Sequence, residues 1–334
     1  MPSFSTTIAV STDNKKATVC SQTRTITVVA GAVFADLAPT QNDLAREIST
    51  IISNEALSGR KTCFFGMTEE LARACPPNYL HAYIGAEPRW NLALWQERQK
   101  RNKSIRNSCN AALRLGCEVR EALVFEELVL QQCEHIRRQW LQTKRLPPLH
   151  FVAETALYLS GKRLFVVECR GTIVGYALVS EAGSGIQPMQ QLEHFVRLPS
   201  APHGTTELLI CRIAEQLASE GASTLSLMLA PFSRKVQCTL PEGRCSAAMK
   251  RYLQAMESFG GYWYNAKGLE HFKAKFQPDE WMPLYCSFPE DMPPVKVLCA
   301  FAEVFLGTSL AKGFLNTARQ TILNIPIASR RKNR

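Results

Sequence analysis

The residues best suited to chemistry lie in one compact segment, residues 264–285, which reads YNAKGLEHFKAKFQPDEWMPLY. Three apolar residues recur there at helical spacing and predict a core-facing stripe: Leu269, Phe272 and Phe276. The same spacing leaves Lys273 pointing outward and sets Lys275 directly before a core phenylalanine. A cation beside buried aromatic rings can clamp an anion, although a solvated helix with lysines that reach to water explains the same composition.

A second candidate site lies in residues 197–207, RLPSAPHGTTE, just before an expected helix. This loop contains a single glycine, Gly204. Loops that wrap a pyrophosphate at a helix N-terminus carry several glycines, because their backbone N–H groups must approach the phosphates closely. The loop therefore disfavours coenzyme A as a ligand. An ordinary strand-to-helix loop, capped by Thr205 or Thr206, is the structural alternative.

The composition predicts a globular, basic protein with two domains or lobes. The 334 residues, 46% of them hydrophobic, are sufficient for a buried core. The 39 Lys and Arg residues outnumber the 29 Asp and Glu residues and give a formal net charge of +10. This balance favours polyanionic partners such as RNA or an acidic lipid surface, and it narrows the partners without defining the chemistry.

Cysteine spacing and the N-terminus both predict a cytoplasmic protein. The 12 cysteines include no C-x-x-C pair and no matched Cys/His spacing, so neither a metal site nor a disulfide framework is expected. A reducing compartment follows from that pattern. The first residues, MPSFSTTIAVSTDNKK, lack a basic segment followed by an apolar core and do not resemble a secretory signal. No apolar run reaches the ~18 residues of a membrane-spanning helix.

The first half of the chain is expected to begin with a flexible polar tail over residues 1–23. The periodicity then predicts a strand over 25–30, a helix from about residue 40 to 58, a strand over 61–67, and helices over 97–116 and 126–143. The helix over 97–116 is the most basic one and ends at a glycine. Leu146-Pro147-Pro148 breaks the chain, which places a lobe boundary near residue 147.

The second half has the clearer pattern. Residues 165–180 predict two strands joined by a turn at Arg170-Gly171. A strand over 192–197, a loop, a helix over 206–221 and a strand over 224–229 follow. This order is the one seen in the acetyltransferases of the GNAT superfamily. It predicts an α/β fold in which a mixed sheet carries helices on both faces.

Five blocks of the sequence resemble a known family. They are CFFGMTEE (63–70), RNKSIRNSCNAALRLGCEVRE (101–121), SAPHGTTELL (200–209), SLMLAPFS (226–233) and the segment over 264–285. In order and approximate spacing they are similar to the C-terminal catalytic domain of phosphatidylglycerol lysyltransferases, the soluble part of the multiple peptide resistance factors that are associated with antibiotic resistance. The resemblance covers roughly residues 25–290. It implies two tandem GNAT-like lobes, each a mixed sheet flanked by helices, over 24–147 and 148–291, with the active site in the second.

The resemblance also implies a function. It indicates an aminoacyltransferase that moves an amino acid from aminoacyl-tRNA to a hydroxyl of a membrane lipid of the phosphatidylglycerol type. Such a transfer needs no cofactor, because the tRNA ester is already activated, and a tRNA donor agrees with the glycine-poor loop. Family members carry a membrane-embedded flippase ahead of this domain, so the present chain is expected to be free-standing.

The catalytic residues implied by the resemblance are Glu207, Arg197 and Lys275. Arg197 or Lys275 would pair with a phosphate, and Glu207 would act as a base or bind the ammonium of the amino acid. Glu207 also suits a purely structural role, because a carboxylate is stabilised by the positive end of the helix dipole. The implied substrate-binding residues are Gly204, Thr205, Thr206, Ser233, Tyr264, Lys273 and Trp281. The implied tRNA-binding residues are Lys100, Arg101, Lys103 and Arg106 of the basic helix.

Two departures from the family pattern leave other functions open. The family usually has Asp at the position of Glu207, and a glycine of the family block is replaced by Leu227 or Met228. A GNAT-like acyltransferase that acts on a soluble amine or peptide is one alternative. A non-catalytic relative that binds RNA or membrane is the other.

Residues 292–334 lie beyond the resemblance and form an expected amphipathic, basic helical extension that ends in SRRKNR. Such a segment can lie in the interface of an anionic membrane, which would place the protein peripherally at the inner face of the cell membrane. Packing of its apolar face onto the second lobe is the equal alternative.

Overall fold

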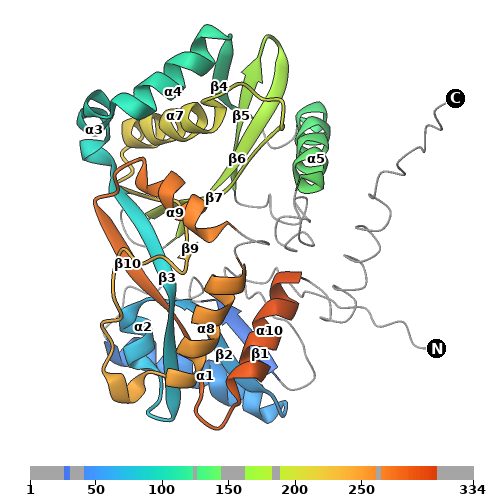
Figure 1. Ribbon diagram of the computed structural model, residues 1–334. Helices are drawn as coiled ribbons and strands as arrows, with labels where there is room; N and C mark the ends of the chain where they lie inside the picture. The colour runs from blue at the N-terminus through green and yellow to red at the C-terminus, as the bar shows by residue number, and fades with distance from the viewer. Residues whose placement is uncertain are drawn as a thin grey trace, which may run out of the picture.

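The computed structural model describes residues 26–30, 41–122, 126–143, 162–182, 189–260 and 265–306. One mixed sheet of ten strands runs through these residues (Figure 1). In sheet order its strands are β1 (Ile26–Ala30), β2 (Lys61–Met67), β10 (Glu280–Pro289), β3 (Tyr79–Asn91), β8 (Thr224–Ser226), β7 (Met189–Arg197), β6 (Thr172–Ala182), β5 (Arg163–Cys169) and β4 (Cys117–Ala122), and β9 (Ala230–Pro231) adds to β3. The expected fold class, a mixed sheet flanked by helices, is confirmed.

Helices cover both faces of the sheet around β2, β10 and β3. One face packs against α1 (Gln41–Leu57) and α2 (Glu69–Ala74), through a core that includes Ile48, Phe64 and Tyr285. The other face packs against α8 (Ala247–Gly260) and α10 (Pro294–Leu306). The strands are apolar on both sides for this reason, and the predicted strands over 25–30 and 61–67 and the helix that ends near residue 58 are confirmed.

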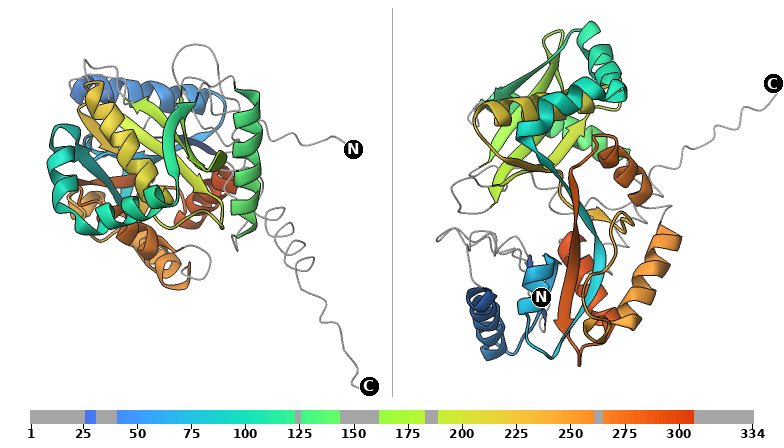
Figure 2. Two further views of the ribbon diagram at one scale, coloured as in Figure 1. Left: turned by 90° about the horizontal axis from the view of Figure 1, so that it is seen from above. Right: turned by 90° about the vertical axis from the view of Figure 1, so that its left-hand side faces the viewer.

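The strands from β4 to β7 form the other half of the sheet. Helix α7 (Thr205–Ser219) covers one face and α5 (Glu127–Gln142) covers the opposite one (Figures 1 and 2). β5 and β6 form the predicted hairpin, and its two turn residues, Arg170 and Gly171, have φ values of 52° and 79°. Two left-handed residues match the right-handed twist of the paired strands.

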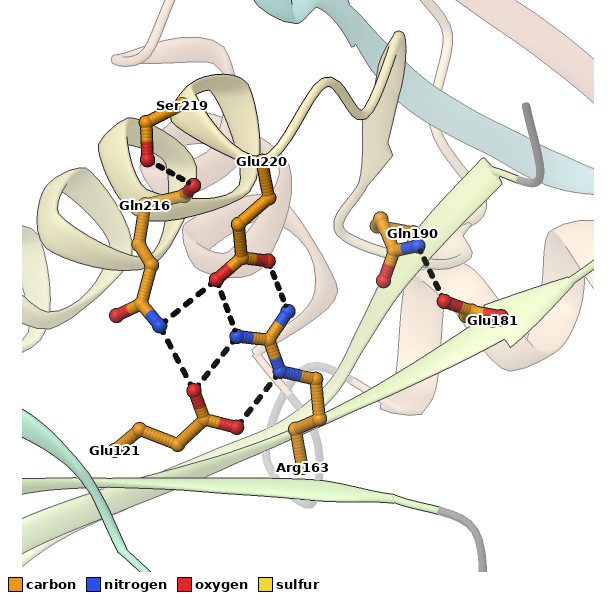
Figure 3. Close-up of polar contacts among 7 residues, drawn as sticks. All are labelled: Glu121, Arg163, Glu181, Gln190, Gln216, Ser219 and Glu220. Atoms are coloured by element: carbon orange, nitrogen blue, oxygen red, sulfur yellow. Dashed lines mark hydrogen bonds and ion pairs between the residues drawn. The ribbon is translucent and has the colours of Figure 1, made fainter.

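A surface charge network links the far end of α7 to the sheet edge (Figure 3). The Arg163 guanidinium on β5 donates to Glu121 on β4 at 2.6 and 2.8 Å and to Glu220 at the end of α7 at 2.5 and 2.8 Å. Gln216 donates to both carboxylates. These shared hydrogen bonds hold the pKa of Glu121 and of Glu220 below the usual value. The network orients α7, whose other end carries Glu207.

The basic helix predicted over 97–116 is in fact two helices, so that prediction is wrong in its continuity. α3 (Trp95–Arg101) ends at Asn102, and α4 (Lys103–Arg114) begins after it. Asn102 has φ −85° and ψ 84°, outside the helical region, and its side-chain oxygen accepts from the N–H of Ile105 at 3.2 Å. Asn102 therefore acts as the N-cap of α4. The helical spacing of polar and apolar residues continues across it, which is why the sequence predicted one helix.

Strand pairing crosses the lobe boundary expected near residue 147. β4, from the first half of the chain, pairs with β5, and β10, from the second half, lies between β2 and β3. The bounds 24–147 and 148–291 stay a prediction for the folding units, but a cut there would separate hydrogen-bonded neighbours.

The described part of the C-terminal extension packs onto the protein. Helix α10 contributes four side chains to the core: Val297, Ala300, Phe301 and Val304. The ring of Phe301 contacts the Phe65 ring on β2, with a centroid-to-centroid distance of 5.2 Å. The helix packs against β1 and β2, which fall within the expected first lobe, and against α8, which falls within the expected second lobe over 148–291. Residues 307–334 and the tail over 1–23 lie outside the described residues. Among the described helices none is long and apolar enough to cross a membrane.

Candidate active site

The structure joins two of the three residues expected to be catalytic. Glu207 lies in the first turn of α7 and is 9% exposed. Lys275 follows the last residue of α9 (Ala266–Ala274), and its Nζ lies 2.7 Å from Oε1 of Glu207. The side chain of Glu207 lies at the positive end of the α7 helix dipole and accepts a hydrogen bond from the Lys275 ammonium. This pair is the centre of the candidate site.

Arg197, the third expected catalytic residue, ends β7 and is exposed. Its guanidinium donates to the carbonyl oxygens of Leu198 and Ala201 at 3.3 and 3.4 Å. These bonds fasten the arginine to the loop that leads into α7. Its proposed role at a phosphate stays a prediction.

The loop glycine has a packing role that the sequence did not reveal. Gly204 caps α7 with φ 86°, and a Cβ built on it would lie 1.9 Å from the carbonyl oxygen of Ser108 on α4. Thr205 is buried and donates through Oγ1 to the Pro202 carbonyl at 2.7 Å, and Thr206 is half-buried. The loop's single glycine therefore serves the close approach of α4 and α7.

Two further side chains, which the sequence interpretation missed, hold Lys275. Ser108 Oγ accepts a hydrogen bond from Lys275 Nζ at 3.1 Å, and Asn102 Nδ2 donates to the Lys275 carbonyl at 2.8 Å. Both residues are buried. Both are neutral polar residues in the otherwise basic stretch over 97–116, and this was the only sequence feature that could have indicated their role. Their common partner, Lys275, lies 167 residues from Ser108 and 173 residues from Asn102 along the chain.

Helix α9 occupies the place where two sheet strands separate. β7 and β8 are parallel and pair only through Gln190 with Leu225 and Gln191 with Ser226. Beyond those pairs, the ring of Phe272 on α9 packs at 5.6 Å from the ring of Phe195 on β7. The helix thus fills the divergence of the two strands with aromatic side chains.

Lys273 is buried, so the expectation that it points outward is wrong. Its side chain enters the sheet at 3% exposure, and Nζ donates to the carbonyl oxygens of Met228 and Leu229, each at 2.9 Å. Burial lowers the pKa of Lys273 to about 7, while the nearby Glu87 carboxylate acts in the opposite direction. Two faces of α9 are therefore covered, one by β7 and one by the segment after β8. The spacing of Leu269, Phe272 and Phe276 predicted only one covered face. A role for Lys273 in substrate binding stays a prediction.

We expect replacement of Lys273 by methionine to change how stability depends on pH. The ordinary lysine pKa of 10.5 applies to the unfolded chain, and the folded value is about 7. Between these values the unfolded state binds more protons, so wild-type stability should fall as the pH is lowered from 10 to 7. The free energy of unfolding should therefore depend more steeply on pH in the wild type than in Lys273→Met, by at most about 1.4 kcal/mol per pH unit. Urea unfolding across this range measures it, with the exposed Lys267→Met on the same helix as control. Parallel curves for wild type and Lys273→Met would contradict the assignment.

The remaining substrate-binding candidates lie apart from the pair or outside the described residues. Ser233 is buried, and its carbonyl accepts from the Tyr83 hydroxyl at 2.7 Å. Trp281 is half-buried on β10, opposite Pro88. Tyr264 lies outside the described residues. Their roles stay predictions.

All four expected tRNA-binding side chains are exposed: Lys100 and Arg101 on α3, and Lys103 and Arg106 on α4. Lys100 forms an exposed ion pair with Glu97 at 2.9 Å. Arg98 on α3 instead turns toward the protein and pairs with Asp279, which also accepts from the backbone N–H of Asn91 at 2.7 Å. The inner side of α3 and α4 thus contacts the segment after α9, and the outer side presents cations.

Within the described ranges, no three His, Cys, Asp or Glu side chains gather as metal ligands would. The candidate site therefore consists of a carboxylate, an ammonium, a hydroxyl and backbone groups. These suit proton transfer and the stabilisation of negative charge.

Comparisons with known proteins agree with this architecture. The C-terminal domain of a protein assigned as a lysylphosphatidylglycerol synthetase in Agrobacterium fabrum superposes with a TM-score of 0.66 at 18% identity, over 85% of this chain and 83% of that one. The structure of L-PGS from Bacillus licheniformis gives a TM-score of 0.64 at 18% identity, over 84% and 82% of the two chains. These likenesses show the shared fold.

Curated relatives match a shorter stretch. The lysylphosphatidylglycerol biosynthesis bifunctional protein LysX of Nocardia farcinica is 32% identical over 118 residues, 34% of this chain and 10% of that protein. LysX of Mycobacterium avium is 30% identical over 112 residues, 33% of this chain and 9% of that protein. The matched stretch is thus about a tenth of the length of these relatives.

A family profile covers most of the chain. The profile described as "Phosphatidylglycerol lysyltransferase, C-terminal" matches residues 8–288, a span that includes the Glu207–Lys275 pair, α4 and all of the sheet except the last residue of β10. The chain therefore belongs to the family of the phosphatidylglycerol lysyltransferase C-terminal domain.

Proposed function

We propose that this chain transfers an aminoacyl group from aminoacyl-tRNA to a hydroxyl of a membrane lipid of the phosphatidylglycerol type. The observation that carries the proposal is the pair formed by buried Glu207, at the start of α7, and half-buried Lys275. Membership of the lysyltransferase family supports the lipid acceptor and the transferase class.

The proposed reaction is an ester exchange. The lipid hydroxyl oxygen attacks the ester carbonyl carbon of the aminoacyl-tRNA, and Glu207 accepts the hydroxyl proton. The tetrahedral oxyanion is stabilised by the Lys275 ammonium and by backbone N–H groups at the start of α7. Collapse of the intermediate breaks the bond to the tRNA ribose oxygen, which takes the proton back from Glu207. The products are an aminoacyl lipid and uncharged tRNA, and no redox step or cofactor enters the balance.

The structure supports a tRNA ester over coenzyme A as donor. Gly204 stands against the Ser108 carbonyl, so the glycine of the loop before α7 contributes to helix packing. Phe272 packs on β7 at the point where β7 and β8 diverge, and Lys273 donates hydrogen bonds to the carbonyl groups of residues 228 and 229. A pantetheine arm would have to displace these side chains to lie along β7.

The proposal is tested by transfer of label from charged tRNA into lipid. The protein is incubated with a mixture of tRNAs charged with labelled amino acids and with vesicles that contain phosphatidylglycerol. Label in the chloroform phase is the expected result, and the labelled amino acid identifies the donor. Label that stays in the aqueous phase as an aminoacylated amine or peptide would favour the soluble-acceptor alternative. Binding of RNA or vesicles without any transfer would favour a non-catalytic relative.

We place the tRNA backbone on the outer face of α3 and α4. Cations on that face would neutralise phosphates without reading the base sequence. The acceptor is a membrane lipid, so the protein would work as a cytoplasmic, peripherally bound enzyme. Peripheral membrane contact through the extension over residues 292–334 stays part of this proposal, although its described helix, α10, packs onto the sheet.

Removing charge from this face is expected to flatten the salt dependence of tRNA binding. In the double variant Arg101→Ala/Lys103→Ala, the slope of log K against log salt concentration should decrease in magnitude by about 1 to 2, because two phosphate contacts no longer release counterions. Filter binding or fluorescence anisotropy at several salt concentrations measures it. The matched control removes two exposed cations from α8, as Lys250→Ala/Arg251→Ala. Equal slopes for the α3–α4 variant and wild type would place the tRNA elsewhere.

A further inference from the structure

Three side chains connect α3 and α4 to the segment that carries Lys275. Arg98 pairs with Asp279, Asn102 donates to the Lys275 carbonyl at 2.8 Å, and Ser108 accepts from Lys275 Nζ at 3.1 Å. The contacts follow one another along the inner side of the two helices. They fix both the backbone and the side-chain end of Lys275.

The Ser108 hydroxyl has a defined direction. It donates its own proton to the Ser104 carbonyl, one helical turn earlier, at 3.1 Å. Its lone pairs are therefore available to an incoming donor, and an ammonium has donors only. Ser108 and Glu207 thus take two of the three N–H bonds of Lys275. The third can be offered to a developing oxyanion or to a phosphate.

The position of Ser108 is set by the contact between α4 and α7. The Ser108 carbonyl lies where a side chain on residue 204 would be, so α4 can come this close only because residue 204 is a glycine. The break at Asn102 starts α4 at the level of Lys275 and gives it a direction of its own, separate from α3. One short helix therefore meets the start of α7 and the end of α9 together.

We propose that Ser108 and Asn102 are positioning residues that hold the Lys275 ammonium against Glu207, and that α4 thereby links the polyanion-binding face of the protein to the catalytic pair. The inference rests on the function proposed above and deepens it. Cations on the outer side of α4 meet the tRNA, while Asn102 and Ser108 on its inner side set the geometry in which Lys275 acts.

The test uses Ser108→Ala in the full chain. Alanine is favourable inside a helix, so the fold is retained while the acceptor is lost. The rate of transfer at saturating charged tRNA should fall about tenfold, since a hydrogen bond to a charged group contributes about 1.5 kcal/mol or more. The KM for charged tRNA should be unchanged.

The matched control is Ser104→Ala on the same helix, which keeps the Ser104 carbonyl and touches neither Lys275 nor Glu207 in the described contacts. It should keep the wild-type rate and KM. If Ser108→Ala has the wild-type rate at saturating charged tRNA while the wild-type protein is active, the positioning role is wrong and the proposed function stands.

A measurement without turnover separates the two proposals. Ser108→Ala should lower the midpoint of urea unfolding in the wild-type background and have a smaller effect in Lys275→Met, since the lost contact exists only with the lysine. This coupling is expected whether or not the chain transfers amino acids. An equal shift in both backgrounds overturns the inference. Absence of transfer by the wild-type protein, with coupling present, rejects the proposed function alone.

Discussion

Replacing Glu207 by glutamine is expected to reduce the rate of aminoacyl transfer by about 100-fold to 10,000-fold, the range that a positioned general base supplies. The amide occupies the same space and can still accept a hydrogen bond from Lys275, so the contact between α7 and α9 is kept. The variant loses the capacity to take up the hydroxyl proton, together with the negative charge that pairs with Lys275. The rate is measured as label that moves from charged tRNA into the chloroform phase, at saturating donor.

The matched control for this variant is Glu215→Gln. Glu215 lies on the same helix, is half-exposed and pairs with Arg212 at 2.7 Å, far along α7 from its first turn. It should keep the wild-type rate. Unchanged transfer by Glu207→Gln, with a circular dichroism spectrum like that of wild type, would remove Glu207 from the proton transfer. A raised KM with an unchanged maximal rate would instead assign it to binding of the amino acid's ammonium.

The largest expected effect on stability comes from Gly204→Ala. The residue has φ 86°, and the added Cβ would lie 1.9 Å from the Ser108 carbonyl oxygen and 2.6 Å from its carbonyl carbon. Both contacts are with backbone, so α4 must move away from α7. Backbone strain and overpacking together should lower the free energy of unfolding by about 3 to 5 kcal/mol. Urea unfolding measures this loss, and transfer should fall too because Ser108 leaves Lys275.

Gly59→Ala separates strain from overlap. Gly59 has a similar φ of 70°, but nothing lies within 4 Å of its added Cβ. The strain alone should cost about 1 kcal/mol. If the two variants lost the same stability, the close approach of α4 to α7 would not be the reason that residue 204 is a glycine.

Much of the fold could be predicted from local patterns. The hairpin at Arg170-Gly171 was predictable because two residues between β-branched runs specify a tight turn. The helix over 41–57 was predictable because its apolar stripe faces one core. The break at Asn102 was not, since a buried N-cap leaves the helical period unchanged on both sides. The burial of Lys273 was also missed, because its partners are the carbonyl groups of Met228 and Leu229, which follow a different strand and lie about 45 residues away along the chain.

The candidate site divides in the same way. Glu207 and Lys275 were predicted from residue type and from the family resemblance, and the structure brings them to 2.7 Å. Ser108 was not predicted, because a serine on a basic helix has no distinctive local signal. Its role depends on contacts with residues that are about 100 and 167 positions away along the chain. Local sequence thus identified the charged partners and not the neutral side chain between the helices.

The insertion of β10 between β2 and β3 has a consequence for biosynthesis. Residues 280–289 leave the ribosome after every other described strand, and until then β2 and β3 each lack a hydrogen-bonded neighbour on their facing sides. The N-terminal half-sheet can close only after residues 280–289 have been translated, which makes its assembly depend on contacts of high sequence separation. A nascent chain stalled before residue 280 would therefore expose two unpaired strand edges to aggregation or to a chaperone.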